Sequence, residues 1–203
     1  PNFVPASTGQ SMVPITIAAV GPHSLRLAGE VCDGVRLHPF CTRGYLEEVC
    51  MPRIAEGMAR TGRSREHFEV TGGGFIATGK DDAEVAKAVE WVRYRIAFYG
   101  STPSYWPVLE HHGYGDLGRK LNRMTKEGKW DEIAAEIPDD VVALFAAIGR
   151  YDELPGAIEA RFGGASDAVF ASTSQDVRPD IPSDVIAAIQ AIPTDFVGYK
   201  TPW

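Results

Sequence analysis

The stretch VPITIAAVGPHSLRLAGEVCDGVRLH, Val13 to His38, decides the fold. Its first part, Pro14 to Val20, is short, uncharged and partly β-branched, which predicts a strand buried on both faces. Gly21-Pro22 ends that strand, and the apolar spacing of Ser24 to Val31 predicts an amphipathic helix. A second strand, Val35 to Phe40, follows and is cut short by its proline.

Strands and helices continue to alternate beyond this stretch. A helix is predicted from Thr42, its N-cap, to Thr61-Gly62, with a kink or break at Pro52. The other predicted elements are a strand over Phe68–Thr78, helices over Ala83–Tyr99, Leu117–Ile137, Asp139–Ile148 and Asp152–Phe162, a fourth strand over Ala168–Ser172, and a last helix over Ser183–Ile192. This order predicts an α/β fold with a parallel sheet, either open or half of an eight-stranded barrel.

Composition excludes several classes of protein. The net charge is -7 and the basic residues do not cluster, so no nucleic-acid partner is expected. The chain has no apolar run of membrane length and no signal peptide, so no membrane partner is expected. Three cysteines without a CxxC pair predict no metal site and indicate a reducing, cytoplasmic location.

The turn Ala19 to Ser24 is the first candidate for chemistry. A helix that begins directly after a strand presents backbone N–H groups without acceptors, and its dipole favours an anion such as phosphate. Gly21 lets a ligand approach the backbone, and His23 or Ser24 can add a side-chain donor. One glycine carries much less information than a GxGxxG motif, so an ordinary βα turn is the alternative.

His38 is the second candidate, at the carboxyl end of the predicted second strand, where parallel α/β proteins place binding and catalytic groups. The alternative is a histidine satisfied by a neighbouring carbonyl. Cys41 follows the strand and either lines the same mouth or packs in the core. Asp33 lies at the amino end of the strand and is interpreted as a turn and capping residue.

Further motifs have structural interpretations. The run Gly72-Gly73-Gly74 inside a predicted strand indicates a bulge or the close approach of a ligand or another backbone. His111 and His112 have no third ligand at a suitable spacing, which favours a surface loop or subunit contact over a metal site. Three aromatic residues form a lid or anchor the segment around them: Tyr105, Trp106 and Trp130.

The segment IAAVGPHSLRLAGEVCDGVRLHP resembles the hallmark of the luciferase-like monooxygenase superfamily, whose members typically carry P-I-Y-I-A-A-x-G-P-x-x-x-x-L-A-G-x-x-A-D-G-V. The match covers Pro14 to Val35 and departs from the pattern at Thr16 and Cys32, where Tyr and Ala are commoner. RIAFYGSTPSYWPVLEHHGYGDLG, Arg95 to Gly118, is similar to a subfamily of deazaflavin-dependent oxidoreductases. The resemblance extends to about Ser172.

The resemblance implies a (β/α)8 TIM barrel of which this chain supplies the C-terminal half, about strands five to eight. The catalytic residues are then unknown, because the family carries them on strands one to four. The cofactor, coenzyme F420 or FMN, is expected at Ala18, Ala19, Val20, Gly21 and His23. The substrate-binding positions are His38 and Cys41.

The cofactor implies hydride transfer to or from a small-molecule substrate. Since a deazaflavin does not readily activate oxygen, the resemblance favours a dehydrogenase or reductase over a monooxygenase. The alternatives are a non-catalytic half-barrel that pairs through exposed barrel edges, and an independent phosphate-binding domain. For the oxidoreductase and for the half-barrel, we expect a homo-oligomer or pairing through exposed barrel edges.

We expect one partial barrel domain over residues 1–203. It comprises an irregular lead-in at 1–12, a helical insertion at 100–150, and a C-terminal helix and tail at 173–203. The lead-in is rich in Pro, Ser and Gly and lacks an initiator Met, which predicts that the front of a larger protein is missing.

Overall fold

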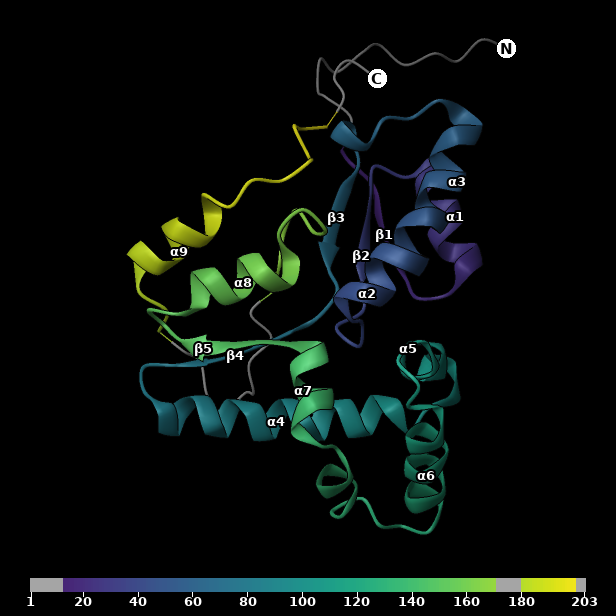
Figure 1. The fold of residues 1–203 in the computed structure, drawn as a ribbon. Helices are drawn as coiled ribbons and strands as arrows, with labels where there is room; N and C mark the ends of the chain where they lie inside the picture. Colours follow the sequence, from purple (N-terminus) through teal and green to yellow (C-terminus); the bar gives the residue numbers. More distant parts are fainter. Residues whose placement is uncertain (1–12, 171–179, 200–203) are drawn as a thin grey trace, which may run out of the picture.

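The computed structural model describes residues 13–170 and 180–199. Three strands form a parallel sheet in the order β1-β2-β3. They are β1 (Thr16–Ala19), β2 (Gly34–Leu37) and β3 (Glu69–Gly72). The crossover helices α1 (Pro22–Val31) and α3 (Met51–Thr61) lie together on one side of this sheet (Figure 1). The predicted α/β alternation and parallel pairing are confirmed.

Only one face of this sheet is covered among the described residues. Side chains that point toward α1 and α3 are buried in one cluster, which includes Ala19, Val35, Leu37, Val70, Leu25 and Ile54. On the opposite face, Thr16, Ala18 and Arg36 are exposed. The prediction that the first strand is buried on both faces is therefore wrong, because an uncharged sequence does not reveal whether anything packs on the second face.

Two glycines bring α1 and α3 into backbone contact. A Cβ atom on Gly29 would lie 2.1 Å from the Ile54 carbonyl oxygen, and one on Gly57 would lie 2.0 Å from the Arg26 carbonyl oxygen. Both distances are far below contact, so no other residue fits at either position without separating the helices.

The segment between β2 and α3 contains a π-helical turn. Thr42 caps α2 (Arg43–Tyr45), since its hydroxyl accepts the Tyr45 N–H, as predicted. The π-helical turn Leu46–Cys50 follows without a break in the helical backbone, and Pro52 then lies in the first turn of α3. The predicted break is thus absent, and a π-helical turn precedes the proline instead.

The glycine run bends the third predicted strand into two. Gly72 and Gly73 have φ of 89° and 96°, which favours glycine, and β4 (Phe75–Gly79) continues in a new direction. β4 pairs in parallel with β5 (Ala146–Arg150) in a second sheet. The predicted helix Asp139–Ile148 is therefore wrong at its end: α7 (Asp139–Phe145) stops where pairing with β4 begins. A local helical pattern cannot show this long-range pairing.

Helices cover both faces of the second sheet. α4 (Asp82–Gly100) lies along one face and α8 (Leu154–Phe162) along the other (Figure 1). Accordingly Phe75 and Ala77 belong to the cluster on the α4 side, and Ile76 belongs to the cluster on the α8 side. The smaller helix α9 (Ser183–Gln190) packs on α8.

The segment predicted as a helical insertion, residues 100–150, is largely helical up to Phe145, and its last part, Ala146–Arg150, is the strand β5. It contains α5 (Trp106–His111), α6 (Gly115–Lys126) and the 3-10 turn Ile133–Glu136. The predicted helix Leu117–Ile137 ends early because Gly128, at φ 78°, reverses the chain. The apolar sides of these elements pack on α4 with Ile96, Leu109, Leu121, Ile133 and Phe145.

The predicted fourth strand is reduced to one bridge in the described part of the chain. Ala168 pairs with Thr71 in parallel, and Ala171 and Ser172 lie outside the described residues. The lead-in 1–12 and the parts of the tail at 173–179 and 200–203 also lie outside them. No helix within residues 13–170 and 180–199 is long and apolar enough to cross a membrane.

We expect Gly57→Ala to lower the free energy of unfolding by about 1–3 kcal/mol, because the added methyl group must push α3 away from α1. Urea unfolding measures this change. Gly156→Ala is the matched control: it lies in α8, nothing surrounds its Cβ position, and the variant should be unchanged or up to about 1 kcal/mol more stable. Equal stability of the two variants would contradict the close contact.

Candidate functional site

The first candidate site lies at the carboxyl edge of the three-stranded sheet. Ala19 and Leu37 are paired across β1 and β2, so the residues that follow them, Val20 and His38, leave the sheet side by side. The two candidates that the sequence predicted separately, the turn after β1 and the histidine after β2, therefore belong to one edge.

The turn after β1 leads directly into α1. The Gly21 carbonyl accepts the Leu25 N–H at 3.0 Å and the Ser24 hydroxyl at 2.9 Å, so the Ser24 proton is already used. Pro22 has no N–H, and the N–H groups of His23 and Ser24 have no acceptor within the helix, as in any first turn. The turn thus presents two backbone donors at the positive end of the helix dipole.

Gly21 is not required by the backbone. Its φ of -85° and ψ of 160° are available to every residue, and a Cβ atom there would have nothing within 4 Å. The position is therefore open space beside the two backbone donors. A glycine that the fold itself does not need, next to unsatisfied N–H groups, fits a phosphate group held against the main chain.

Of the predicted cofactor contacts, Ala18, Val20 and His23 are exposed around this open space. Ala19 is different: its side chain is 3% exposed and packs against α1, so it presents only its backbone. Three of the five predicted side chains are thus accessible, those of Ala18, Val20 and His23, and Gly21 is half-buried between them in the sequence.

His38 is half-buried between Tyr99, at the end of α4, and Tyr105, in the insertion. Its ring centroid lies 4.4 Å from that of Tyr99 and 4.7 Å from that of Tyr105. Its Nδ1 accepts the Phe40 backbone N–H at 3.0 Å, which leaves the proton of the neutral ring on Nε2. Burial, with a smaller effect of the Arg95 guanidinium, lowers the pKa of His38. His38 is therefore a neutral hydrogen-bond donor at physiological pH.

Cys41 does not line the surface that His38 reaches. Its side chain is 4% exposed and lies in the same core cluster as Leu46 and Cys50. The backbone of Cys41 has a structural role instead, because its carbonyl accepts a bond from Arg161 at 2.6 Å. We leave Cys41 out of the proposed site, since a substrate would have to displace the core to reach its sulfur.

Arg161 is a buried residue that the sequence did not single out. It joins α8 to the Cys41 carbonyl and to the Gly73 carbonyl at 2.8 Å, and burial lowers its pKa to about 10. Arg43, in the segment after β2, donates hydrogen bonds to the Ala160 and Gly163 carbonyls at the end of α8. These bonds fix the loop after β2 against the glycine bend, and so they hold the segment that carries His38.

The histidine pair connects the insertion to the loop after β2. His112 Nε2 lies 2.6 Å from the Thr42 hydroxyl, and His111 lies 3.5 Å from the exposed carboxylate of Glu48. Within the described residues no group of three or more His, Cys, Asp or Glu side chains is placed to hold a metal ion. The pair therefore fastens α5 in place.

The three aromatic residues of the insertion have different environments. The Trp106 indole donates to the Gly100 carbonyl at 3.0 Å and anchors the start of α5. Tyr105 packs on His38, which favours the lid interpretation for this residue. Trp130 is 42% exposed and lies against Phe98.

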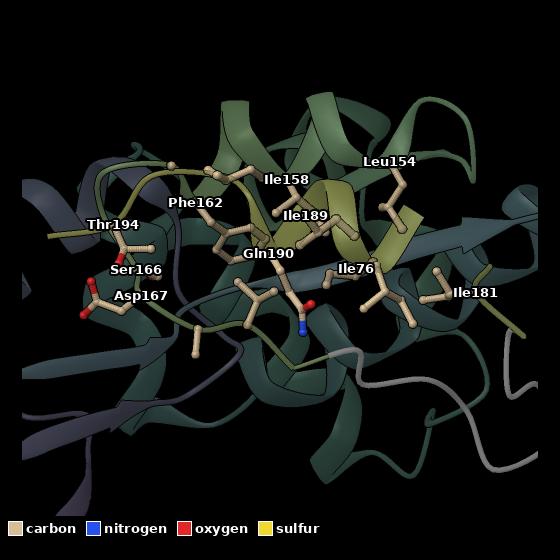
Figure 2. A pocket seen from close by; sticks show the side chains of 15 residues that line it. Ile76, Leu154, Ile158, Phe162, Ser166, Asp167, Ile181, Ile189, Gln190 and Thr194 are labelled. Carbon is tan, nitrogen blue, oxygen red and sulfur yellow. The ribbon is translucent and has the colours of Figure 1, made fainter. Parts of the chain in front are cut away.

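A separate apolar pocket of about 550 Å³ lies between α8, α9 and β4 (Figure 2). Figure 2 shows Ile76, Ile158, Phe162 and Ile189 around it, with Asp167 and Thr194 at one end. The Asp167 carboxylate is already bound to Arg65 and to the Val70 N–H near the amino end of β3. This pocket is thus chemically unlike the edge that carries Gly21 and His38.

Comparison with known proteins identifies the family. The family model described as luciferase-like monooxygenase matches residues 1–166, and the chain therefore belongs to this family. An uncharacterized protein of Mycobacterium tuberculosis is 42% identical over 179 residues, which cover 87% of this chain and 53% of the relative. The 5,10-methylenetetrahydromethanopterin reductase of Archaeoglobus fulgidus is 30% identical over 149 residues, which cover 70% of this chain and 42% of the relative.

Solved structures show the same fold. The coenzyme F420-dependent tetrahydromethanopterin reductase of Methanopyrus kandleri superposes with a TM-score of 0.64 at 25% identity, over 88% of this chain and 48% of that chain. An F420-dependent secondary alcohol dehydrogenase superposes with a TM-score of 0.56 at 16% identity, over 88% of this chain and 49% of that chain. The chain spans about half the length of the relatives it matches.

We expect the pKa of His38 to lie below the ordinary histidine value of about 6.5 and to rise in Arg95→Gln, because one of the two causes of the shift is removed. It should remain below the ordinary value, since burial is the larger cause. NMR titration of the imidazole resonances measures this pKa. Lys87→Gln is the control, because it removes an exposed cation that lies about 12 Å from Arg95 along α4. This variant should leave the pKa of His38 unchanged.

Proposed function

We propose that this chain binds the phosphate-bearing tail of coenzyme F420 at the turn Val20–His23 and forms part of an F420-dependent oxidoreductase. The observation that carries the proposal is the open position at Gly21, beside the first backbone N–H groups of α1. Several relatives are named as F420-dependent or as reductases of the same kind, namely the reductases above and a putative coenzyme F420-dependent oxidoreductase of Mycobacterium tuberculosis, and this favours F420 over FMN.

The residues of the turn have distinct roles in this proposal. The N–H groups of His23 and Ser24 bind phosphate oxygens, and the exposed His23 side chain adds a donor beside them. The helix dipole contributes about 0.3–1 kcal/mol to each such contact with an anion. Ala18 and Val20, both exposed and apolar, provide a wall for the adjoining part of the cofactor.

When bound, a reduced deazaflavin supplies a hydride, and the oxidised form accepts one. The residues of this chain orient the two reactants at the carboxyl edge of the sheet. The neutral His38 offers its Nε2–H to an oxygen of the small-molecule substrate, while Tyr105 limits access of water to the imidazole. Because a deazaflavin does not readily activate oxygen, we favour a reductase or dehydrogenase over a monooxygenase. We further propose that the described strands correspond to strands five to eight of the barrel.

A non-catalytic half-barrel is the second candidate. Among residues 13–170 and 180–199, β1 has a neighbouring strand on one side only, and Thr16 and Ala18 on its uncovered face are exposed. An unpaired strand edge favours pairing with another chain or a second copy. In that case the turn at Gly21 would bind no cofactor.

Titration of the purified chain with F420 and with FMN, followed by fluorescence, tests the proposal. We expect saturable binding of F420, and we expect Gly21→Val to weaken it at least about tenfold, or about 1.4 kcal/mol. The reason is that the valine side chain fills the space of the phosphate, whereas the fold leaves room for it.

Gly156→Val is the matched control, because its Cβ position is equally open but lies on α8. It should bind F420 as the unchanged chain does, and both variants should unfold at similar urea concentrations. If neither cofactor binds at high micromolar concentration, the half-barrel is the better description. If F420 binds equally to Gly21→Val, the phosphate does not lie at this turn.

A further inference from the structure

Three hydrogen-bond donors from two distant parts of the chain meet beyond the end of β2. His38 follows β2, whereas Arg95 and Tyr99 lie one turn apart on α4. The Arg95 guanidinium donates to the Tyr99 hydroxyl, and the Tyr99 ring contacts the His38 ring edge-on at 4.4 Å between centroids. The hydroxyl proton of Tyr99 and the Nε2–H of His38 both remain as donors.

Arg95 has no acidic partner in the described part of the chain. Its guanidinium lies among the rings of Tyr99, Trp91 and Phe98, with centroids at 4.8, 5.6 and 5.8 Å, and its Nε is buried without an acceptor. Arg93, two residues earlier on the same helix, is different, because it pairs with both Glu90 and Asp139. The sequence did not single out Arg95, since it looks like any other cation on a helix.

A half-buried cation beside two further donors is an incomplete arrangement. Removing a guanidinium from water is unfavourable unless acceptors replace the lost hydration. Among the described neighbours the Tyr99 hydroxyl accepts one bond from Arg95, but Nε has no acceptor and no carboxylate balances the charge. The planar guanidinium matches the paired oxygens of a carboxylate or phosphate, and the aromatic surroundings strengthen such a bond. The cluster lies beside the turn at Gly21, one strand away on the same edge of the sheet.

We propose that Arg95, with His38 and Tyr99, binds an anionic group of the substrate, a carboxylate or a phosphate. The proposal rests on the proposed function, which brings the substrate to this edge beside the cofactor. It assigns the substrate class as a small molecule that carries an anion, and it makes Arg95 a determinant of specificity. The same chemistry could be supplied by the cofactor's own tail, and the experiment separates these two sources.

Histidine NMR resonances of the full chain provide the test, because His38 reports on this cluster and His23 reports on the turn at Gly21. The probes are inorganic phosphate and acetate, added at constant ionic strength and pH. We expect at least one of them to shift the His38 resonance saturably. Arg95→Gln should weaken this response about tenfold or more, and Arg95→Lys, which keeps the charge but loses the planar fork, should weaken it less.

Lys87→Gln removes a cation from the same helix and should respond as the unchanged chain does. Gly21→Val should weaken F420 binding at least about tenfold and remove any phosphate response of His23, while His38 still responds. If the unchanged chain does not bind F420, the proposed function is contradicted. If neither phosphate nor acetate shifts the His38 resonance, this inference is contradicted. The inference is also overturned if the His38 resonance of Arg95→Gln shifts with phosphate or acetate as it does in the unchanged chain. It is likewise overturned if Arg95→Gln is folded, as its histidine resonances show, but binds F420 more weakly, since the anion then belongs to the cofactor.

Discussion

Two buried carboxylates hold the amino ends of the parallel strands, and the rest of the structure depends on them. The Asp33 carboxylate accepts the Ile15 N–H and pairs with Arg63, each at 2.8 Å. The Asp167 carboxylate accepts the Val70 N–H at 2.7 Å and pairs with Arg65 at 2.9 Å. Because a slip of one residue would turn every strand side chain to the opposite face, these bonds at fixed backbone positions protect the register.

This arrangement separates stability from binding along the strands. The charged groups at the amino edge form ion pairs with each other, whereas donors at the carboxyl edge, in the turn at Gly21 and at His38, remain available. The glycines divide in the same way. Gly29 and Gly57 are required by helix packing, Gly72 and Gly73 by the bend of the backbone, and Gly21 by neither. Gly156 on α8 is equally open, so the feature that makes Gly21 a candidate ligand site is the pair of unpaired backbone N–H groups beside it.

Local chemistry made much of the fold predictable. Thr42 as a cap and Gly62 as a left-handed helix end both act through neighbours within a few residues. Asp33, predicted to be a turn and capping residue, instead binds Ile15 and Arg63, which lie 18 and 30 residues away in the sequence. The errors have two origins. The strand Ala146–Arg150 exists because β4 offers a parallel partner from far away in the sequence, and this constraint leaves no periodic pattern. The early end of α6 has a local cause, the left-handed Gly128 that the helical prediction ran past.

The candidate site shows the same division. The strand, glycine turn and helix of Pro14 to Val31 specify their own geometry, and the hallmark segment marks the family, so the sequence by itself determined the turn and the class of protein. Tertiary structure alone decided that Cys41 is buried and that Arg95 lies beside His38. The physical reason is that a turn is formed by consecutive residues, whereas burial and the placement of charges depend on elements from distant parts of the sequence, such as α4 and α8.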